Sequence, residues 1–227
     1  MKKLSKLAVT AALGMMVLIA GAAQAATINL AEWAYNQDGG ISSVYSGSGF
    51  DSATGLGSLS FNVSGAGAHE FIAYFDHEID ESINTFFNEY GVTSGTPDSI
   101  QSWEIDEPGW TYGDIYTNLT SGALDNTNGV PATAPDDVSM AIGWDFSLVA
   151  GETAKISYFL TTTAPTGEFY LEQFDPDSQA SIFFYSTYAV GGGGTQVPEP
   201  STLLLLGAGL AGLGLYGRRS RSKKVTV

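Results

Sequence analysis

The segment from Leu56 to Gly65 alternates apolar and polar positions with a period of two. Its apolar residues Leu59, Phe61 and Val63 stand between serine and asparagine residues. Successive side chains of a strand point to opposite faces, so this pattern predicts a strand with one buried face.

Five further segments are rich in aromatic and β-branched residues, a composition typical of strands. They cover residues 69–79, 138–148, 153–161, 167–174 and 181–188. The turn Ala150-Gly151-Glu152 separates two of them and predicts a β-hairpin. Many short strands with such turns predict a mainly β fold, an antiparallel β-sandwich of jelly-roll or immunoglobulin-like type.

Residues 79–91 follow a different period and predict the one short helix of the body. Positions i, i+4, i+7, i+8 and i+11 are apolar, which is typical of one helical face. They are Ile79, Ile83, Phe86, Phe87 and Tyr90. Asp80 is placed to cap the start of this helix and Gly91 to follow its end. We expect the helix to cover an end of the sandwich.

The N-terminus has the three-part pattern of a secretory signal peptide. Lysines precede an apolar run, and Ala23-Gln24-Ala25 has the small-residue pattern of a cleavage site. We expect signal peptidase to cleave after Ala25 and the chain to be exported. The alternative is a retained N-terminal anchor.

The C-terminus contains a short apolar segment followed by basic residues. Residues 201–217 would span about 25 Å as a helix, against about 30 Å for a bilayer core. The segment contains five glycines, so its membrane insertion is marginal. The cluster that begins with Arg218 and Arg219 would keep the C-terminus in the cytoplasm.

This tail resembles the PEP-CTERM sorting signal of Gram-negative bacteria. The resemblance rests on VPEPST at residues 197–202, the Gly/Leu-rich segment and GRRSR at residues 217–221. It implies recognition and cleavage by an exosortase, a transient stay in the inner membrane, and then the cell surface or the extracellular matrix. The residues implied in recognition are Val197, Pro198, Glu199, Pro200, Arg218 and Arg219. A plain single-span anchor is the alternative.

These features divide the chain into five parts. They are a signal peptide (1–25), a body (26–190), a glycine-rich linker (191–196), a sorting signal with a transmembrane helix (197–221) and a basic cytoplasmic tail (222–227). The chain has no cysteine, so packing must hold the body together without disulfides.

The body is strongly acidic. Between the signal peptide and the sorting signal stand 23 acidic residues and one lysine, Lys155, a net charge of −22. Such a surface repels nucleic acid and anionic lipid, which excludes nucleic acid as a partner, and it attracts cations. It also keeps an exported protein soluble.

The acidic segments suggest calcium as a possible ligand, because calcium needs only oxygen ligands. The candidate ligands are Asp76, Glu78, Asp80, Asp125, Asp175 and Asp177. None of their segments matches an EF-hand loop, and aspartate also dominates ordinary turns. Of the two histidines, His69 and His77, the second is expected at the surface among acids, with a transition-metal site as the alternative.

No pattern in the body indicates an enzyme, and we expect none, with no catalytic residues and no cofactor. The candidate residues for an aromatic platform that stacks on sugars are Trp103, Trp110, Trp144, Tyr112 and Tyr116. The sequence therefore predicts an exported surface or matrix protein with a structural or adhesive role, associated with exopolysaccharide and biofilm. The alternatives are a carbohydrate-binding module and a calcium-binding extracellular protein.

Overall fold

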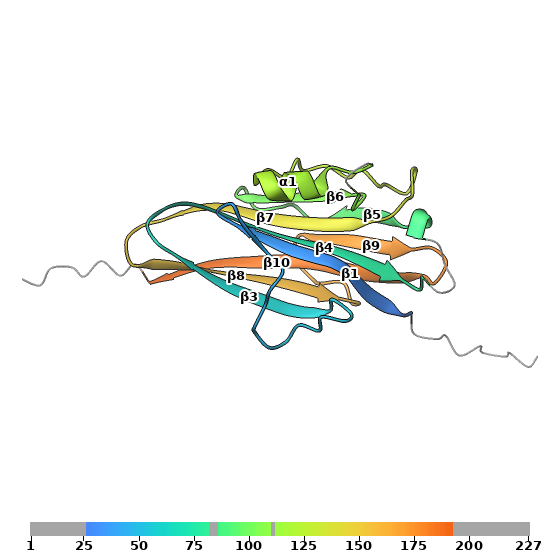
Figure 1. Ribbon diagram of the computed structural model, residues 1–227, viewed down its shortest axis with the longest axis horizontal. Helices are drawn as coiled ribbons and strands as arrows, with labels where there is room; N and C mark the ends of the chain where they lie inside the picture. Colours follow the sequence, from blue (N-terminus) through green and yellow to red (C-terminus); the bar gives the residue numbers. More distant parts are fainter. Residues whose placement is uncertain (1–25, 82–85, 110–111, 193–227) are drawn as a thin grey trace, which may run out of the picture.

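Two antiparallel five-stranded sheets pack face to face, as Figure 1 shows. The computed structural model describes residues 26–81, 86–109 and 112–192. Sheet A has the order β2-β1-β4-β7-β6 and sheet B the order β3-β8-β10-β9-β5. The strands are β1 (Ile28–Gln37), β2 (Gly40–Ser42), β3 (Gly57–Ser64), β4 (Gly67–Ile79), β5 (Tyr90–Ser94), β6 (Gln101–Asp106), β7 (Ser139–Leu148), β8 (Glu152–Thr161), β9 (Tyr170–Asp175) and β10 (Ala180–Gly192). The predicted antiparallel sandwich is confirmed.

The core lies between the sheets and follows the predicted alternation. In β3, Leu59 and Val63 are buried while Ser60 and Asn62 are exposed. In β10 the buried positions recur at every second residue, beginning with Ile182. All six strands expected from the sequence are present, within a few residues of their predicted bounds.

A second, smaller core lies on the outer face of sheet A. The helix α1 (Ile115–Ser121) places Ile115 and Leu119 against Ile72 and Tyr74 of β4. The helix ends at Gly122, whose φ of 76° is a left-handed conformation that glycine adopts without steric cost. Because α1 covers this face, β4 is buried on both sides along much of its length.

The predicted helix over residues 79–91 is wrong. Ile79 is the last residue of β4, Phe86–Asn88 form a 3₁₀ turn, η1, and Tyr90 begins β5. Gly91 pairs with Gln173 as a strand residue. The helical spacing arose because the end of one strand, a turn and the start of the next strand each contribute apolar side chains.

The predicted hairpin at Ala150-Gly151-Glu152 is also wrong. β7 pairs with β4 and β6 in sheet A, whereas β8 pairs with β3 and β10 in sheet B. The predicted turn is present, since the Glu152 N–H donates to Val149 O at 3.1 Å. It connects sheet A to sheet B and does not join two neighbouring strands of one sheet. Figure 1 shows this connection at one end of the sandwich.

The last strand extends into the predicted glycine linker. Gly191 pairs with Thr153 and Gly192 with Glu152. Their backbone groups still find partners on β8, although the φ of 80° at Gly192 already departs from the extended conformation of the strand.

Candidate functional site

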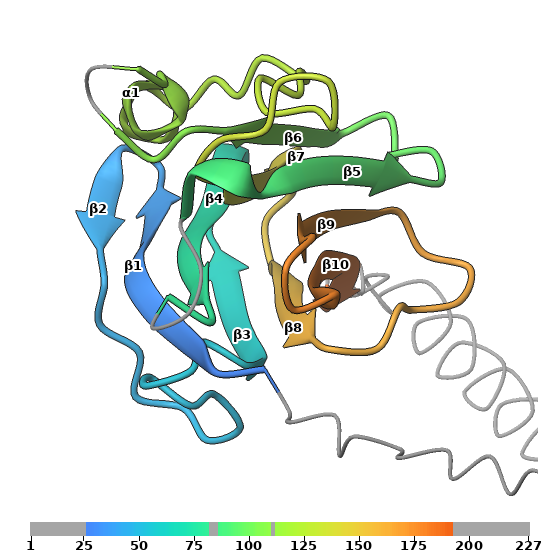
Figure 2. The ribbon, with the colours of Figure 1, turned by 90° about the vertical axis from the view of Figure 1, so that its right-hand side faces the viewer.

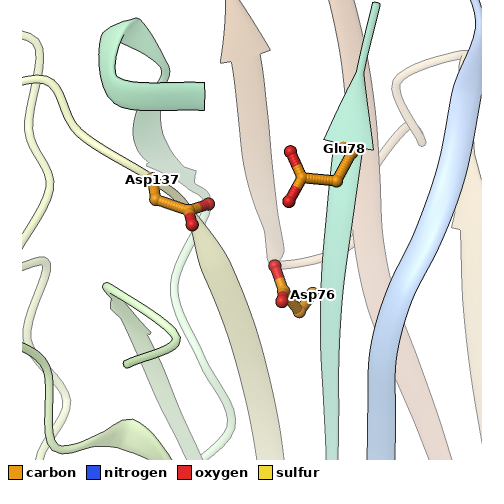
Figure 3. Close-up of side chains that lie close together, drawn as sticks. All are labelled: Asp76, Glu78 and Asp137. Atoms are coloured by element: carbon orange, nitrogen blue, oxygen red, sulfur yellow. The ribbon is translucent and has the colours of Figure 1, made fainter. Parts of the chain in front are cut away.

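Three carboxylates converge on the outer side of sheet A, as Figure 3 shows. Asp76 and Glu78 are two residues apart on β4, so they point to the same face. Asp137 lies shortly before β7, the neighbouring strand, where Ser139 pairs with Asp76. One oxygen from each of the three side chains lies within 4.8 Å of the others. We call these three residues the acidic cluster.

Burial and mutual repulsion hold protons on this cluster. Burial raises the pKa of Asp76 to about 8, and the charges of Asp137, Glu78 and Glu32 act in the same direction. Burial also raises the pKa of Asp137 to about 7, with Glu78 the largest charge contribution. The pKa of Glu78 is raised as well, first by burial and then by Glu81.

The described part of the protein offers few groups that could neutralise the negative charge of the ionised acidic cluster. Asp76 Oδ1 and Asp137 Oδ1 are buried without a hydrogen-bond partner. Lys155 is the one lysine or arginine in the part of the chain that the structure describes, and it lies on β8 in sheet B. Such a cluster can be neutralised by protons or by a hard cation that prefers carboxylate oxygens.

A second acidic group, Glu104, Asp106 and Asp114, differs because the protein already provides donors. Asn118 Nδ2 donates to both carboxylate oxygens of Glu104, at 3.0 and 3.1 Å. The Asp114 N–H donates to Asp106 Oδ2 at 2.8 Å. These contacts fix the start of α1 against β6, so the second group has a structural role.

The predicted calcium ligands Asp80 and Asp125 do not join the acidic cluster. Asp80 Oδ1 accepts a hydrogen bond from Thr27 N–H at 2.6 Å and so holds the start of the described chain. Asp125 Oδ1 accepts from the Thr127 N–H at 2.9 Å and from its hydroxyl at 2.7 Å. Both carboxylates thus accept hydrogen bonds from the backbone, Asp80 from the distant Thr27 and Asp125 within its own turn.

Asp175 and Asp177 also have local roles. Asp175 accepts hydrogen bonds from the N–H of Asp177 at 2.9 Å and of Ser178 at 3.1 Å, and thereby shapes the β9–β10 turn. Asp177 accepts from Asn88 Nδ2 at 2.9 Å. Of the six predicted ligands, therefore, the structure brings together Asp76 and Glu78. It adds Asp137, which no spacing in the sequence marked.

His77 is buried in the core, so its expected place at the surface is wrong. It lies on the opposite face of β4 from Asp76 and Glu78, the face toward sheet B. Burial lowers its pKa to about 4, opposed only by the nearby backbone of Gly55. His77 joins neither of the two candidate metal-binding groups found in the described residues.

His69 and Glu89 are two further titratable groups near β4. His69 Nδ1 lies 3.0 Å from Asp38 Oδ2, and this hydrogen bond is the main cause of its raised pKa. Glu89 is buried, which raises its pKa to about 9. Gln173 Nε2 donates to Glu89 Oε2 at 2.5 Å and to the His77 carbonyl at 2.7 Å, which joins β9 to β4.

The predicted aromatic platform is not assembled. Trp144 is buried between the sheets, and Trp103 packs against the same core. Tyr116 lies on α1, on the other side of sheet A. Tyr112 is 83% exposed, and Trp110 lies outside the described residues.

The outer face of sheet B carries a different set of aromatic side chains. They occupy the positions that alternate with the buried residues of β8, β9 and β10, with one more on β5, and each is half-buried. We call this set the aromatic face: Tyr90, Phe159, Tyr170, Phe174, Phe183 and Tyr185.

Cross-strand register places these rings side by side. Phe159 is directly opposite Tyr185, and the two rings stack with centroids 4.8 Å apart and planes at 13°. Tyr170 and Phe183 meet edge to face at 5.5 Å. The sequence showed the alternation in these strands, but not that their rings would share one face.

The loop that joins β8 to β9 passes along this face, as Figure 2 shows, and is rich in threonine. A pocket of about 710 Å³ lies between residues 161–166 of the loop, Glu168 and Tyr185. A second pocket of about 550 Å³ lies on the side of Phe183. The face therefore combines flat apolar rings with hydroxyl groups.

The residues predicted to act in export and sorting lie outside the described residues. They are Ala23, Ala25, Val197, Pro198, Glu199, Pro200, Arg218 and Arg219. The apolar segment 201–217 lies there too. Within the described ranges, 26–81, 86–109 and 112–192, no helix is long and apolar enough to cross a membrane.

Comparison with known proteins identifies the C-terminal segment. A search of curated proteins and a search of solved structures found no match. Residues 196–221 match the family model described as the PEP-CTERM protein-sorting motif. The motif implies export and membrane-associated sorting by an exosortase. The C-terminal segment thus carries the PEP-CTERM protein-sorting motif, as the resemblance of the tail predicted.

Proposed function

We propose that the acidic sandwich is an adhesive, non-catalytic protein of the bacterial cell surface or extracellular matrix. An exosortase would release it from the inner membrane by cleavage near Pro198-Glu199-Pro200. The motif at residues 196–221 supports the processing step. The body precedes the motif directly, since β10 ends at Gly192.

The aromatic face is the observation that carries the adhesive role. Aromatic rings pack well on the apolar faces of sugar rings, and hydroxyl groups can bond to sugar hydroxyls. On sheet B, the stacked pair Phe159 and Tyr185 lies next to Thr161 and the threonines of the β8–β9 loop. We propose that this face contacts extracellular polysaccharide.

The negative charge of the body favours a neutral polysaccharide over an anionic one. The body carries a net charge of −22, and Glu168 and Glu172 stand near the aromatic face. An anionic polymer would be repelled by this surface, whereas a neutral glycan would not. We therefore propose a neutral polysaccharide as the ligand.

Affinity electrophoresis of the full-length chain in gels that contain neutral or anionic polysaccharides tests this function. The wild-type protein should be retarded by a neutral polysaccharide. Tyr185→Ala should abolish the retardation, because it removes the ring that stacks on Phe159. The melting temperature of the variant shows that it is folded.

Tyr112→Ala is the matched control, because Tyr112 is an exposed aromatic residue that lines a different pocket, beside Asp136 and Asp137. It should bind like the wild type. If Tyr112→Ala loses binding while Tyr185→Ala retains it, or if no neutral polysaccharide retards the wild type, the proposed role of the aromatic face is wrong.

A further inference from the structure

We propose that Asp76, Glu78 and Asp137 form a binding site for one calcium ion. The site lies on the outer side of sheet A, away from the aromatic face of sheet B. It is independent of the proposed adhesion, and each can be tested without the other.

The spacing of the three carboxylates suits an ion of this size. Calcium binds oxygen at about 2.3–2.6 Å, so oxygens on opposite sides of one ion are about 4.6–5.2 Å apart. One oxygen from each of the three side chains lies within 4.8 Å of the other two. The spacing is therefore compatible with a single calcium ion that contacts all three carboxylates after small side-chain rotations.

Asp76 supplies the second observation, independent of the clustering. Its side chain is 7% exposed, and its Oδ1 has no hydrogen-bond partner. Figure 3 shows its carboxylate directed toward those of Glu78 and Asp137. A buried oxygen without a donor is costly, and a bound cation would satisfy it.

The second acidic group differs from the acidic cluster, because its carboxylates have hydrogen-bond donors. Glu104 and Asp106 accept hydrogen bonds from Asn118 and the Asp114 backbone, so their oxygens are already satisfied. A structural role explains that group without an ion, and no such donors serve Asp76 Oδ1 or Asp137 Oδ1.

An open pocket provides a route for the ion and its water ligands. The pocket has a volume of about 460 Å³, and its lining includes Asp137, Asp136 and Glu107. These acids would attract cations to its mouth.

Calcium takes six to eight oxygen ligands and adapts to irregular sites, so about three or more waters would complete its shell. Magnesium demands a stricter octahedron at shorter distances and fits less well.

The test measures calcium binding to the full-length chain in detergent by isothermal titration calorimetry, after treatment with EDTA. The variants are Asp76→Asn and Asp137→Asn. Asp114→Asn is the matched control, since it removes one acid from the second group. Wild type and Asp114→Asn should bind one calcium ion with a Kd of about 0.1–1 mM, as extracellular modules do. Both cluster variants should bind at least about tenfold more weakly.

Thermal melting separates loss of the site from loss of the fold. In EDTA, Asp137→Asn should melt at or above the wild-type temperature, because an amide replaces an acid that is crowded by others. Calcium should raise the wild-type melting temperature more than sodium chloride does at matched ionic strength. Equal shifts with both salts, wild-type calcium affinity in both cluster variants, or magnesium binding as tight as calcium binding would each overturn the proposal.

Discussion

Trp144 on β7 donates a hydrogen bond from its indole Nε1–H to Ser186 Oγ on β10, at 3.0 Å. Both residues are buried, so this polar contact joins sheet A to sheet B inside the apolar core. Gln101 Nε2 donates to the same hydroxyl at 3.1 Å. One serine thus satisfies two donors from the opposite sheet.

Ser186→Ala should therefore destabilise the protein although the side chain is small. The indole N–H would stay buried without an acceptor, at a cost of about 1–3 kcal/mol in the free energy of unfolding. Urea denaturation followed by tryptophan fluorescence measures the change. Ser147→Ala, at an exposed position of β7, is the control and should change the stability by less than about 0.5 kcal/mol. Similar costs for the two variants would contradict this role of Ser186.

The close approach of Gly55 to His77 predicts that a side chain at position 55 destabilises the protein. Gly55 has a φ of 69°, and a β-carbon there would overlap the His77 imidazole. Gly55→Ala should cost about 2–4 kcal/mol in the free energy of unfolding, from backbone strain together with the steric overlap. Gly39→Ala separates the two causes, because Gly39 has a φ of 84° but open space around it. It should cost only about 1–2 kcal/mol, and equal losses would show that the contact with His77 is unimportant.

Glu104 predicts a pH dependence of stability. Burial raises its pKa in the folded protein to about 7, and Asp125 and Asp114 add to this against the hydrogen bond from Asn118. The folded state then binds more protons than the unfolded state between about pH 4.5 and 7, so Glu104 makes stability fall as the pH rises through this range.

Glu104→Gln should remove that contribution. The variant should match the wild type near pH 4 and be more stable at pH 8, because the amide still accepts from Asn118 and carries no charge. Urea midpoints measured from pH 4 to 8 in EDTA test this expectation. A constant difference between the two proteins across the range would contradict it.

The sorting signal predicts the fate of a proline variant. Replacing Pro198 and Pro200 by alanine removes the extended geometry around Glu199 but leaves the apolar segment and its charge unchanged. If the motif acts through that geometry, the variant should accumulate uncut in the inner membrane of its native host. Mass spectrometry of the mature C-terminus decides the matter. A wild-type end near residues 197–201 supports cleavage, and a wild-type end that still contains Arg218 contradicts it.

The strands were predictable because their alternation is a local property. Leu59 and Val63 face the core whatever the rest of the chain does. The pairing of strands is not a local property. The residues of the turn at Gly151 are compatible both with a hairpin within one sheet and with a connection between two sheets, so the sequence alone could not distinguish them. The helix α1 was missed because its apolar stripe amounts to Ile115 and Leu119, too little to stand out in seven residues.

The acidic cluster was predictable only in part. Asp76 and Glu78 share a face of one strand by their spacing, which the sequence shows. Asp137 comes from a segment about sixty residues later, and only the pairing of β4 with β7 brings it close. The aromatic face has the same origin, since Phe159 and Tyr185 meet through the pairing of β8 with β10.

The position of β10 has a consequence for the order of events during synthesis. This strand occupies the middle of sheet B, between β8 and β9, yet it is the last of the described strands and ends at Gly192. Sheet B therefore cannot close until synthesis has come within a few residues of the motif at residues 196–221. Two other pairings of sheet B, β3 with β8 and β5 with β9, join segments that are distant in sequence, which slows folding. The complete body is therefore available only once nearly the whole chain up to the motif has been made, and a chain cut short before β10 would lack the middle strand of sheet B.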